Sequence, residues 1–146
     1  MFNMRPLILL LGVLLFVNAA SAVWLHEVIH YDGPAKRLRG TVRDYSGAPI
    51  PFVGVGVYDH PELWDRHSMS MVERRARQKK IASVTADESG RYKIRIRKGV
   101  YEVEFMRMGW STVSVILHVD PNGSDLCMEL PISGSSHGQS KVIECR

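Results

Sequence analysis

The segment Ala86–Trp110 alternates between apolar and charged side chains. A period of two is typical of strands that bury one face of a sheet and expose the other. Its two halves, Arg91–Arg97 and Val100–Phe105, flank the dipeptide Lys98-Gly99, which suits a two-residue turn. The sequence therefore predicts a β-hairpin here and a chain built mainly from half-buried strands.

A two-residue turn fixes the register of this hairpin. It pairs Ile96 with Tyr101, Arg95 with Glu102, Ile94 with Val103, Lys93 with Glu104, and Tyr92 with Phe105. Every apolar residue then meets an apolar one and both glutamates meet a base, each pair contributing about 0.2–1 kcal/mol. The basic residues of this segment are Arg91, Lys93, Arg95, Arg97 and Lys98. With two of them neutralised, we interpret this run as a solvated sheet face and expect no nucleic-acid partner.

Residues 1–22 have the features of a secretory signal peptide. A start with one basic residue precedes the apolar run Pro6–Val17, and Ala20-Ser21-Ala22 is a small-residue cleavage site. The run is too short for a comfortable membrane span, so we expect no stable membrane insertion after cleavage, although an uncleaved anchor stays open. The expected location is secreted or periplasmic. The mature chain is only mildly basic, which favours no particular partner.

The two cysteines, Cys127 and Cys145, both lie in the expected mature chain. Because that part leaves the reducing cytosol, a disulfide between them is the default interpretation. It would tie the tail, residues 133–146, to the last predicted strand, from which Cys127 is expected to face outward.

The rest of the chain predicts a single domain over residues 37–132, after an N-terminal arm at 23–36. Turn signals separate seven predicted strands, two of them in the hairpin. The other five are Leu38–Arg43, Pro51–Asp59, Ile81–Asp87, Ser111–Val119 and Ser124–Ile132. This pattern predicts an all-β, seven-stranded antiparallel β-sandwich with one helical insertion, residues 60–80, between the second and third strands.

The insertion offers two candidate surfaces. Leu63, Trp64, His67 and Met71 form a helical stripe that we expect to lie over the sheet near Gly54 and Gly56, because strand glycines often mark a close approach. The basic surface at its end consists of Arg74, Arg75, Arg77, Lys79 and Lys80. We interpret these bases as a solvated helix end, with an anion-binding surface as the alternative.

The arm contains a formal match to a zinc-protease motif, His26-Glu27-Val28-Ile29-His30. That chemistry needs a helix, so that both imidazoles face one metal, and a distant third ligand. Asp32-Gly33-Pro34 follows at once and disfavours a helix. We therefore expect plain surface histidines and no metal. A non-catalytic site using His26 and His30, with His60 or His67, stays open.

Several segments resemble the carboxypeptidase regulatory-like domain across residues 37–132. They are Leu38–Asp44, Gly47–Pro51 with Val53, Val55 and Val57, Thr85–Asp87, Gly90–Ile94, Gly99–Phe105 and Gly109-Trp110. The resemblance implies a transthyretin-like sandwich, classed with carbohydrate-binding-like folds, that serves as a non-catalytic module of secreted or surface proteins. The insertion departs from this family, which usually has a short link there. The Tyr-Arg-Gly-Ser ending of the related hydroxyisourate hydrolase is absent.

Together these observations predict a non-catalytic interaction module that contacts another cell-envelope protein. No catalytic residue and no cofactor is expected, because no convergent set of reactive groups can be assembled. The alternative is a carbohydrate-binding module, which would use the aromatic faces of Trp64, Trp110 and Tyr58.

Overall fold

The computed structural model describes residues 26–35, 38–123, 125–129 and 140–145 of the 146-residue chain. Its strands are β1 (His26–Ala35), β2 (Leu38–Arg43), β3 (Gly54–Tyr58), β4 (Lys80–Thr85), β5 (Arg91–Ile94), β6 (Gly99–Met106), β7 (Thr112–Val119), β8 (Leu126–Glu129) and β9 (Lys141–Glu144). The predicted signal peptide, residues 1–22, and tail residues 133–139 lie outside the described part.

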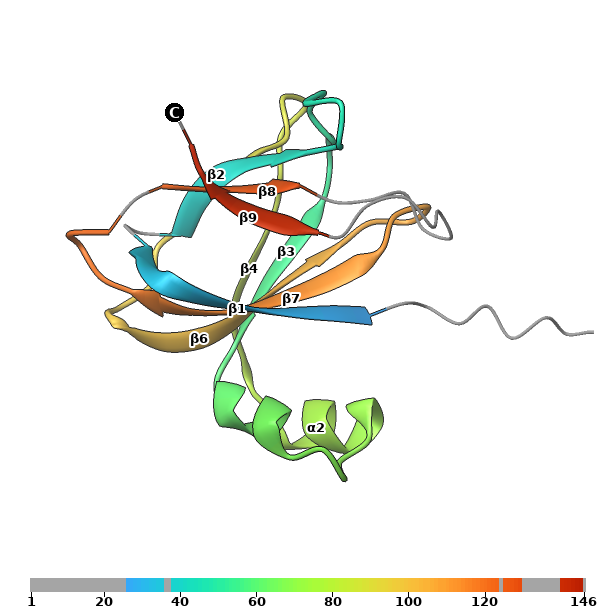
Figure 1. Cartoon of the computed structure of the whole chain (residues 1–146), viewed down its shortest axis with the longest axis vertical. Coiled ribbons are helices and arrows are strands. Elements are labelled where there is room, and N and C mark those ends of the chain that lie inside the picture. The colour runs from blue at the N-terminus through green and yellow to red at the C-terminus, as the bar shows by residue number, and fades with distance from the viewer. Residues whose placement is uncertain (1–25, 36–37, 124, 130–139, 146) are drawn as a thin grey trace, which may run out of the picture.

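Two mixed sheets form the molecule (Figure 1). One has five strands in the order β1-β7-β6-β3-β4, and the other has four in the order β5-β2-β8-β9. The all-β prediction is confirmed, but the seven-stranded, fully antiparallel arrangement is wrong. β2–β8 correspond to the seven expected strands, whereas β1 and β9 come from the segments assigned to the arm and the tail. β1 runs parallel to β7, and β2 runs parallel to β8.

The hydrophobic core lies between the two sheets. The five-stranded sheet contributes Val55, Val57, Val103, Phe105, Val113, Val115, Leu117 and Val119. The four-stranded sheet contributes Leu38, Val42, Tyr92, Ile94, Leu126 and Met128. Gly40 allows β2 to approach β8 closely, because a Cβ at this position would lie 1.4 Å from the Leu126 carbonyl oxygen.

The predicted hairpin is wrong. β5 pairs with β2, whereas β6 pairs with β3 and β7, so the two halves of the alternating segment belong to different sheets. Alternation specifies which face of a strand is buried, but it does not specify which other strand it pairs with. Tyr92 and Phe105 do meet, edge to face with ring centroids 5.4 Å apart, but they meet across the core. Glu102 and Glu104 therefore do not face the bases of β5.

The insertion folds into two short helices, the 3₁₀ helix η1 (Pro61–Asp65) and α2 (Met71–Arg77). Ser70 and Glu73 form a capping box that begins α2, because each side chain satisfies a backbone N–H of the other. The single stripe predicted across the segment is therefore broken: Leu63 is buried but His67 is exposed. No helix in the described ranges is long and apolar enough to cross a membrane.

The predicted disulfide is confirmed. Cys127 of β8 bonds to Cys145, which follows β9, with an S–S distance of 2.03 Å. The expected outward exposure of Cys127 is wrong, since the residue is buried. The pairing of β9 with β8, which the sequence analysis did not foresee, accompanies this burial.

Candidate functional site

A polar cluster lies on the outer face of the five-stranded sheet, under the insertion. We call it the Arg75 cluster; its members are His26, Arg75, Gln78, Glu102, Glu104 and Ser114. The alternation of β6 explains its position, because Val103 and Phe105 face the core and the two glutamates must face the other way. Glu102 is nevertheless fully buried, because the insertion covers this face.

Arg75 joins α2 to the sheet. Its Nη1 donates to Glu102 Oε2 at 2.9 Å and its Nη2 donates to Glu102 Oε1 at 2.7 Å, a bidentate pair. Nη2 also donates to Glu104 Oε2 at 2.5 Å. The guanidinium lies over the Tyr58 ring, 3.9 Å from its centroid. Charge-assisted bidentate pairs are among the strongest protein hydrogen bonds, so this residue fixes the insertion in place.

Two further donors complete the shell of Glu102. Gln78 Nε2 donates to Oε2 at 2.6 Å, and Ser114 Oγ donates to Oε1 at 2.5 Å. Burial raises the pKa of Glu102, but the hydrogen bonds from Arg75, Ser114 and Gln78 together outweigh burial and lower that pKa below its usual value. The carboxyl group is therefore ionised at neutral pH despite its burial.

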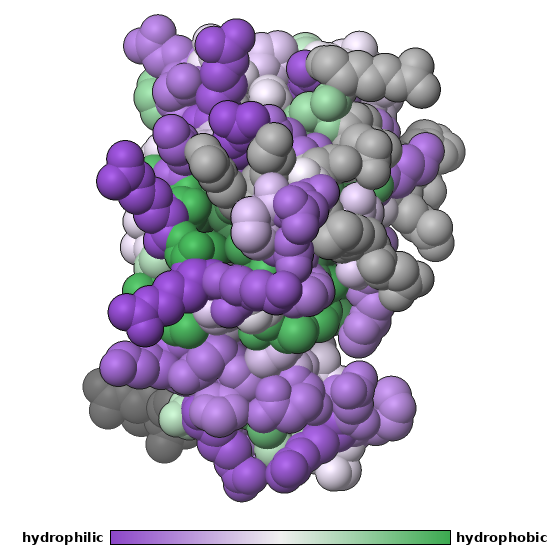
Figure 2. All heavy atoms as spheres, turned by 90° about the vertical axis from the view of Figure 1, so that its left-hand side faces the viewer, coloured by the Kyte–Doolittle hydropathy of each residue, from purple (hydrophilic) through white to green (hydrophobic). Residues whose placement is uncertain are grey.

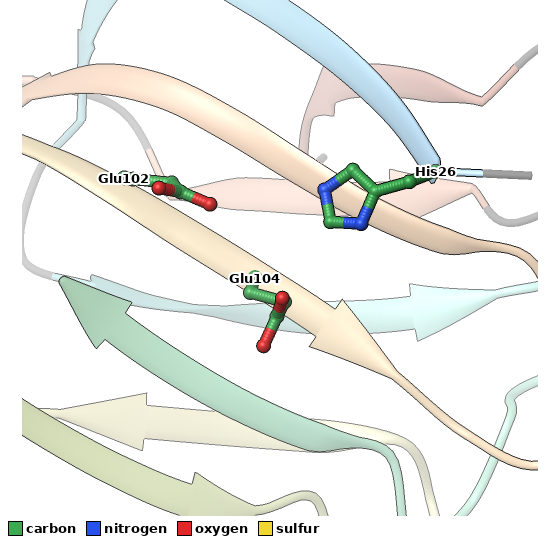
Figure 3. Close-up of side chains that lie close together, drawn as sticks. All are labelled: His26, Glu102 and Glu104. Carbon is green, nitrogen blue, oxygen red and sulfur yellow. The ribbon is translucent and has the colours of Figure 1, made fainter. Parts of the chain in front are cut away.

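His26 approaches the cluster from β1 (Figure 3). A hydrogen bond of 2.9 Å links its Nε2 to Ser114 Oγ, and its ring stacks on Trp64 with centroids 5.2 Å apart. Burial lowers the pKa of His26 below 6.5, and the attraction of Glu104 and Glu102 only partly opposes this effect. His26 is therefore neutral at physiological pH.

The nitrogen of His26 and the carboxylate oxygens of Glu102 and Glu104 lie within 4.8 Å of one another. One imidazole and two carboxylates are a suitable donor set for a divalent transition metal. However, Arg75 already binds both carboxylates and supplies the positive charge that a cation would bring. The arrangement is thus a closed ion-pair cluster, and a metal would have to displace Arg75.

The predicted sugar-binding aromatic residues do not form an open platform. Tyr58 is buried under Arg75, and Lys80 lies 5.2 Å from its ring centroid. Trp64 is half-buried and carries the Arg74 guanidinium 3.9 Å from its ring centroid. Trp110 is half-buried against the core. The ring of Tyr58, rather than the helix itself, fills the space over Gly56.

The predicted basic surface is divided between the interior and solvent. Arg74 is buried, with its guanidinium donating to the carbonyl oxygens of Leu63 and Met69, and Arg75 is committed to the cluster. Arg77, Lys79 and Lys80 remain exposed. The prediction of a continuous solvated helix end is therefore wrong for two of its five residues.

The histidine motif lies on a strand, which excludes the helical zinc-protease geometry. His26 and His30 share a face of β1, but four residues of strand separate their backbones by about 13 Å. His60 is exposed and contacts Glu62 at 2.9 Å, and His67 is exposed. The structure thus does not bring these four histidines together. The expectation of plain surface histidines is wrong for His26, which is half-buried.

Sequence reasoning missed Glu102, Glu104, Gln78 and Ser114 as members of one site. A signal existed: Ser114 interrupts an apolar run, and two glutamates occupy a strand otherwise built for burial. The predicted hairpin paired both glutamates with nearby basic residues, so nothing suggested that they needed a partner elsewhere in the chain.

Comparisons with known proteins place this chain in no family. No family model matches it, and no curated protein matches it. Among solved structures, 3-chlorocatechol 1,2-dioxygenase from Rhodococcus opacus 1CP aligns with a TM-score of 0.38 and 12% sequence identity, over 84% of this chain and 66% of the dioxygenase chain. A similarity of this size carries no argument about fold or function.

Acidification is expected to destabilise the protein partly through His26. Because the pKa of the folded-state imidazole lies below 6.5, the unfolded chain binds more protons, and stability rises with pH up to about that value. This contribution is present above pH 6.5 and is lost as the pH falls through the folded-state pKa. Urea unfolding at pH 7.5 and pH 5.5 should show a smaller loss for His26→Phe than for the wild type. The matched variant His67→Gln, at an exposed position, should behave like the wild type. An unchanged pH dependence in His26→Phe would contradict the assignment.

Proposed function

We propose that this chain is a secreted or periplasmic, non-catalytic binding module that contacts another cell-envelope protein through its helical insertion. The observation that carries the proposal is the two-sided construction of the insertion. Arg75 fastens its inner side to β6, and Arg74 ties its two helices together through the carbonyl oxygens of Leu63 and Met69. On the outer side, Val72 is 80% exposed and Arg77 is also exposed. A surface that is already held in place loses little conformational freedom on binding.

The disulfide supports the proposed compartment. Bonds such as Cys127–Cys145 persist in oxidising environments, namely outside the cell, in the periplasm or in the secretory pathway. The predicted signal peptide, residues 1–22, leads to the same proposal independently.

The pairing within the Arg75 cluster supports a non-catalytic role. A catalytic carboxylate must reach a reacting atom, but Glu102 is fully buried and accepts hydrogen bonds from Arg75, Gln78 and Ser114. These groups neutralise and satisfy one another, which is what a structural clamp requires.

The resemblance to the carboxypeptidase regulatory-like domain also supports a binding role. The segments that carry it lie on β2, β3, β5 and β6, at the end of β4, and in the turns next to these strands. We further propose that the molecule is a variant of the transthyretin-like sandwich, with β1 and β9 added. In such a variant the insertion would be the part specific to this protein.

The outer surface of the insertion suits a reversible protein contact. Figure 2 shows hydrophilic side chains over the lower end of the molecule, where the insertion lies, and hydrophobic side chains gathered in a band above it. Non-obligate interfaces are about as polar as the rest of a protein surface, so a mainly polar surface with an isolated exposed valine fits this class.

Site-specific photo-crosslinking in the native cell envelope tests the proposal. A photoreactive residue at position 72 should give one discrete adduct with an envelope protein. The control places the same photoreactive residue at position 88, in place of Glu88 in the exposed turn between β4 and β5, and should not give that adduct. Absence of an adduct from position 72, or the same adduct from both positions, would rule out the insertion as the contact.

A further inference from the structure

The outer face of the four-stranded sheet carries basic residues that the pairing of the strands brings together. Arg39 of β2 lies directly opposite Lys93 of β5, and Thr41 lies opposite Arg91. Tyr92 lies between Arg91 and Lys93, and the pair Leu38 and Ile94 lies next to Arg39 and Lys93. All three are buried in the core, so the four side chains named above lie on the solvent side. We call Arg39, Arg91 and Lys93 the cationic face.

Lys93 of the cationic face and the nearby Arg95 lack the neutralising glutamates that the hairpin would have supplied. Glu102 and Glu104 are bound to Arg75 on the other sheet. Among the described residues, only Arg39 of the cationic face has an ion-pair partner, Asp125, at 2.6 Å. Arg95 is also exposed and follows β5 directly. Cross-strand neighbours lie about 5 Å apart, so the repulsion between these bases favours an anionic ligand.

The cationic face is hollowed. An open depression of about 500 Å³ is lined by Arg39, Thr41, Asp87, Arg91, Lys93 and Asp125, among other residues. It therefore combines basic side chains with two carboxylates. Basic groups bind anions, whereas carboxylates accept hydrogen bonds from hydroxyl groups.

We propose that the cationic face binds an acidic polysaccharide. Arg39, Arg91 and Lys93 would hold the carboxylate groups of the polymer, and Asp87 and Asp125 would accept hydrogen bonds from its hydroxyls. In both aspartates one carboxylate oxygen already accepts hydrogen bonds from the protein. Asp87 Oδ1 accepts from the backbone N–H groups of Ser89 and Arg91, and Asp125 Oδ1 accepts from Arg39. Their second oxygens are the acceptors offered to the sugar. This site is separate from the insertion, so it goes beyond the proposed protein contact.

Two other polyanions fit this face less well. A nucleic acid is disfavoured because the disulfide indicates an oxidising compartment without abundant nucleic acid. Docking to an anionic membrane is usually aided by exposed apolar side chains that enter the lipid. The exposed large apolar residues in the described part of the chain are Tyr45, Phe52, Val72, Ile81, Val100, Met106 and Met108, and none of them lies on β2 or β5.

Isothermal titration calorimetry with alginate oligosaccharides at about 0.15 M salt tests this proposal. The wild type should bind alginate, bind more weakly as salt is raised, and ignore neutral dextran. The double variant Arg91→Gln/Lys93→Gln should bind about tenfold more weakly, because it loses two of the three basic side chains that contact the ligand. The matched control Arg77→Gln/Lys79→Gln removes the same charge from an exposed position elsewhere and should change affinity less than about twofold.

A second measurement does not depend on the variants folding. Amide chemical-shift changes in the wild type on adding alginate should concentrate on β2 and β5 and spare α2. No binding by the wild type, an equal loss in both double variants, or shift changes centred on α2 would overturn the proposal. Tighter binding to anionic vesicles or to DNA than to alginate would overturn it as well. None of these results depends on the position-72 crosslink, so the two proposals fail separately.

Discussion

Replacing Arg75 with methionine is expected to destabilise the protein by about 3–5 kcal/mol, the usual cost of removing one partner from a buried ion pair. Glu102 has no exposed surface and receives both of its charge-assisted hydrogen bonds from this guanidinium. Gln78 and Ser114 would remain as neutral donors, which compensate a buried charge only in part. Urea unfolding at pH 7.5 measures the loss.

Two further variants isolate the cause. Arg77→Met makes the same substitution at an exposed position of the same helix and should cost no more than about 0.5 kcal/mol. Arg75→Met/Glu102→Gln removes both charges and should recover part of the stability lost in Arg75→Met, because the fully buried carboxylate of Glu102 is no longer left without its ion-pair partner. If Arg75→Met is as stable as Arg77→Met, the Arg75 cluster is not a clamp.

Removing the disulfide is expected to cost about 3 kcal/mol, as the chain-entropy treatment gives for a loop of this size. Cys127 and Cys145 are 18 positions apart, and the bond holds β9 against β8. Cys127→Ala/Cys145→Ala avoids placing a hydroxyl in the buried position of Cys127. Thermal unfolding of this variant should agree with that of the wild type in the presence of a reductant.

A matched measurement checks that the crosslink, rather than the lost sulfur atoms, is responsible. Cys145→Ala alone breaks the same bond and should lose nearly as much stability as the double variant. A double variant within about 1 kcal/mol of the oxidised wild type would show that this bond adds little to the fold, below the usual range for native disulfides.

The positions of β2–β8 could be predicted because alternation and turn residues act locally. Tyr92 and Ile94, for example, had to be buried together whatever their partner strand was. The partners could not be predicted, because the inner faces of both sheets are apolar and either pairing buries the same side chains. β1 was missed because Gly33 and Pro34 favour a turn, so the segment was assigned to an arm. In the structure the register of β1 with β7 shifts between His30 and Pro34.

The candidate site was predictable only in fragments. Trp64 was expected both on the stripe over the sheet and among the sugar-binding aromatic residues, and it stacks on His26 of β1. Arg74 and Arg75 were interpreted as solvated residues, whereas Arg74 packs on Trp64 within the insertion and Arg75 packs on Tyr58 of the sheet. The hydrogen bonds of the Arg75 cluster join distant parts of the chain. Arg75 and Gln78 bond to glutamates 24–29 positions away, and His26 bonds to Ser114, which is 88 positions away. Contacts at such distances follow from sheet order, which a local pattern does not encode.

Glu102 pairs with Arg75 of the insertion, whereas the predicted hairpin would place it opposite Arg95. A pair of double-mutant cycles tests this central claim most directly. One cycle combines Arg75→Met with Glu102→Gln, and the other combines Arg95→Gln with Glu102→Gln. The structure predicts a coupling of about 2–3 kcal/mol in the first cycle and additivity within about 0.5 kcal/mol in the second. Strong coupling between Arg95 and Glu102, with none between Arg75 and Glu102, would restore the hairpin and contradict the architecture described above.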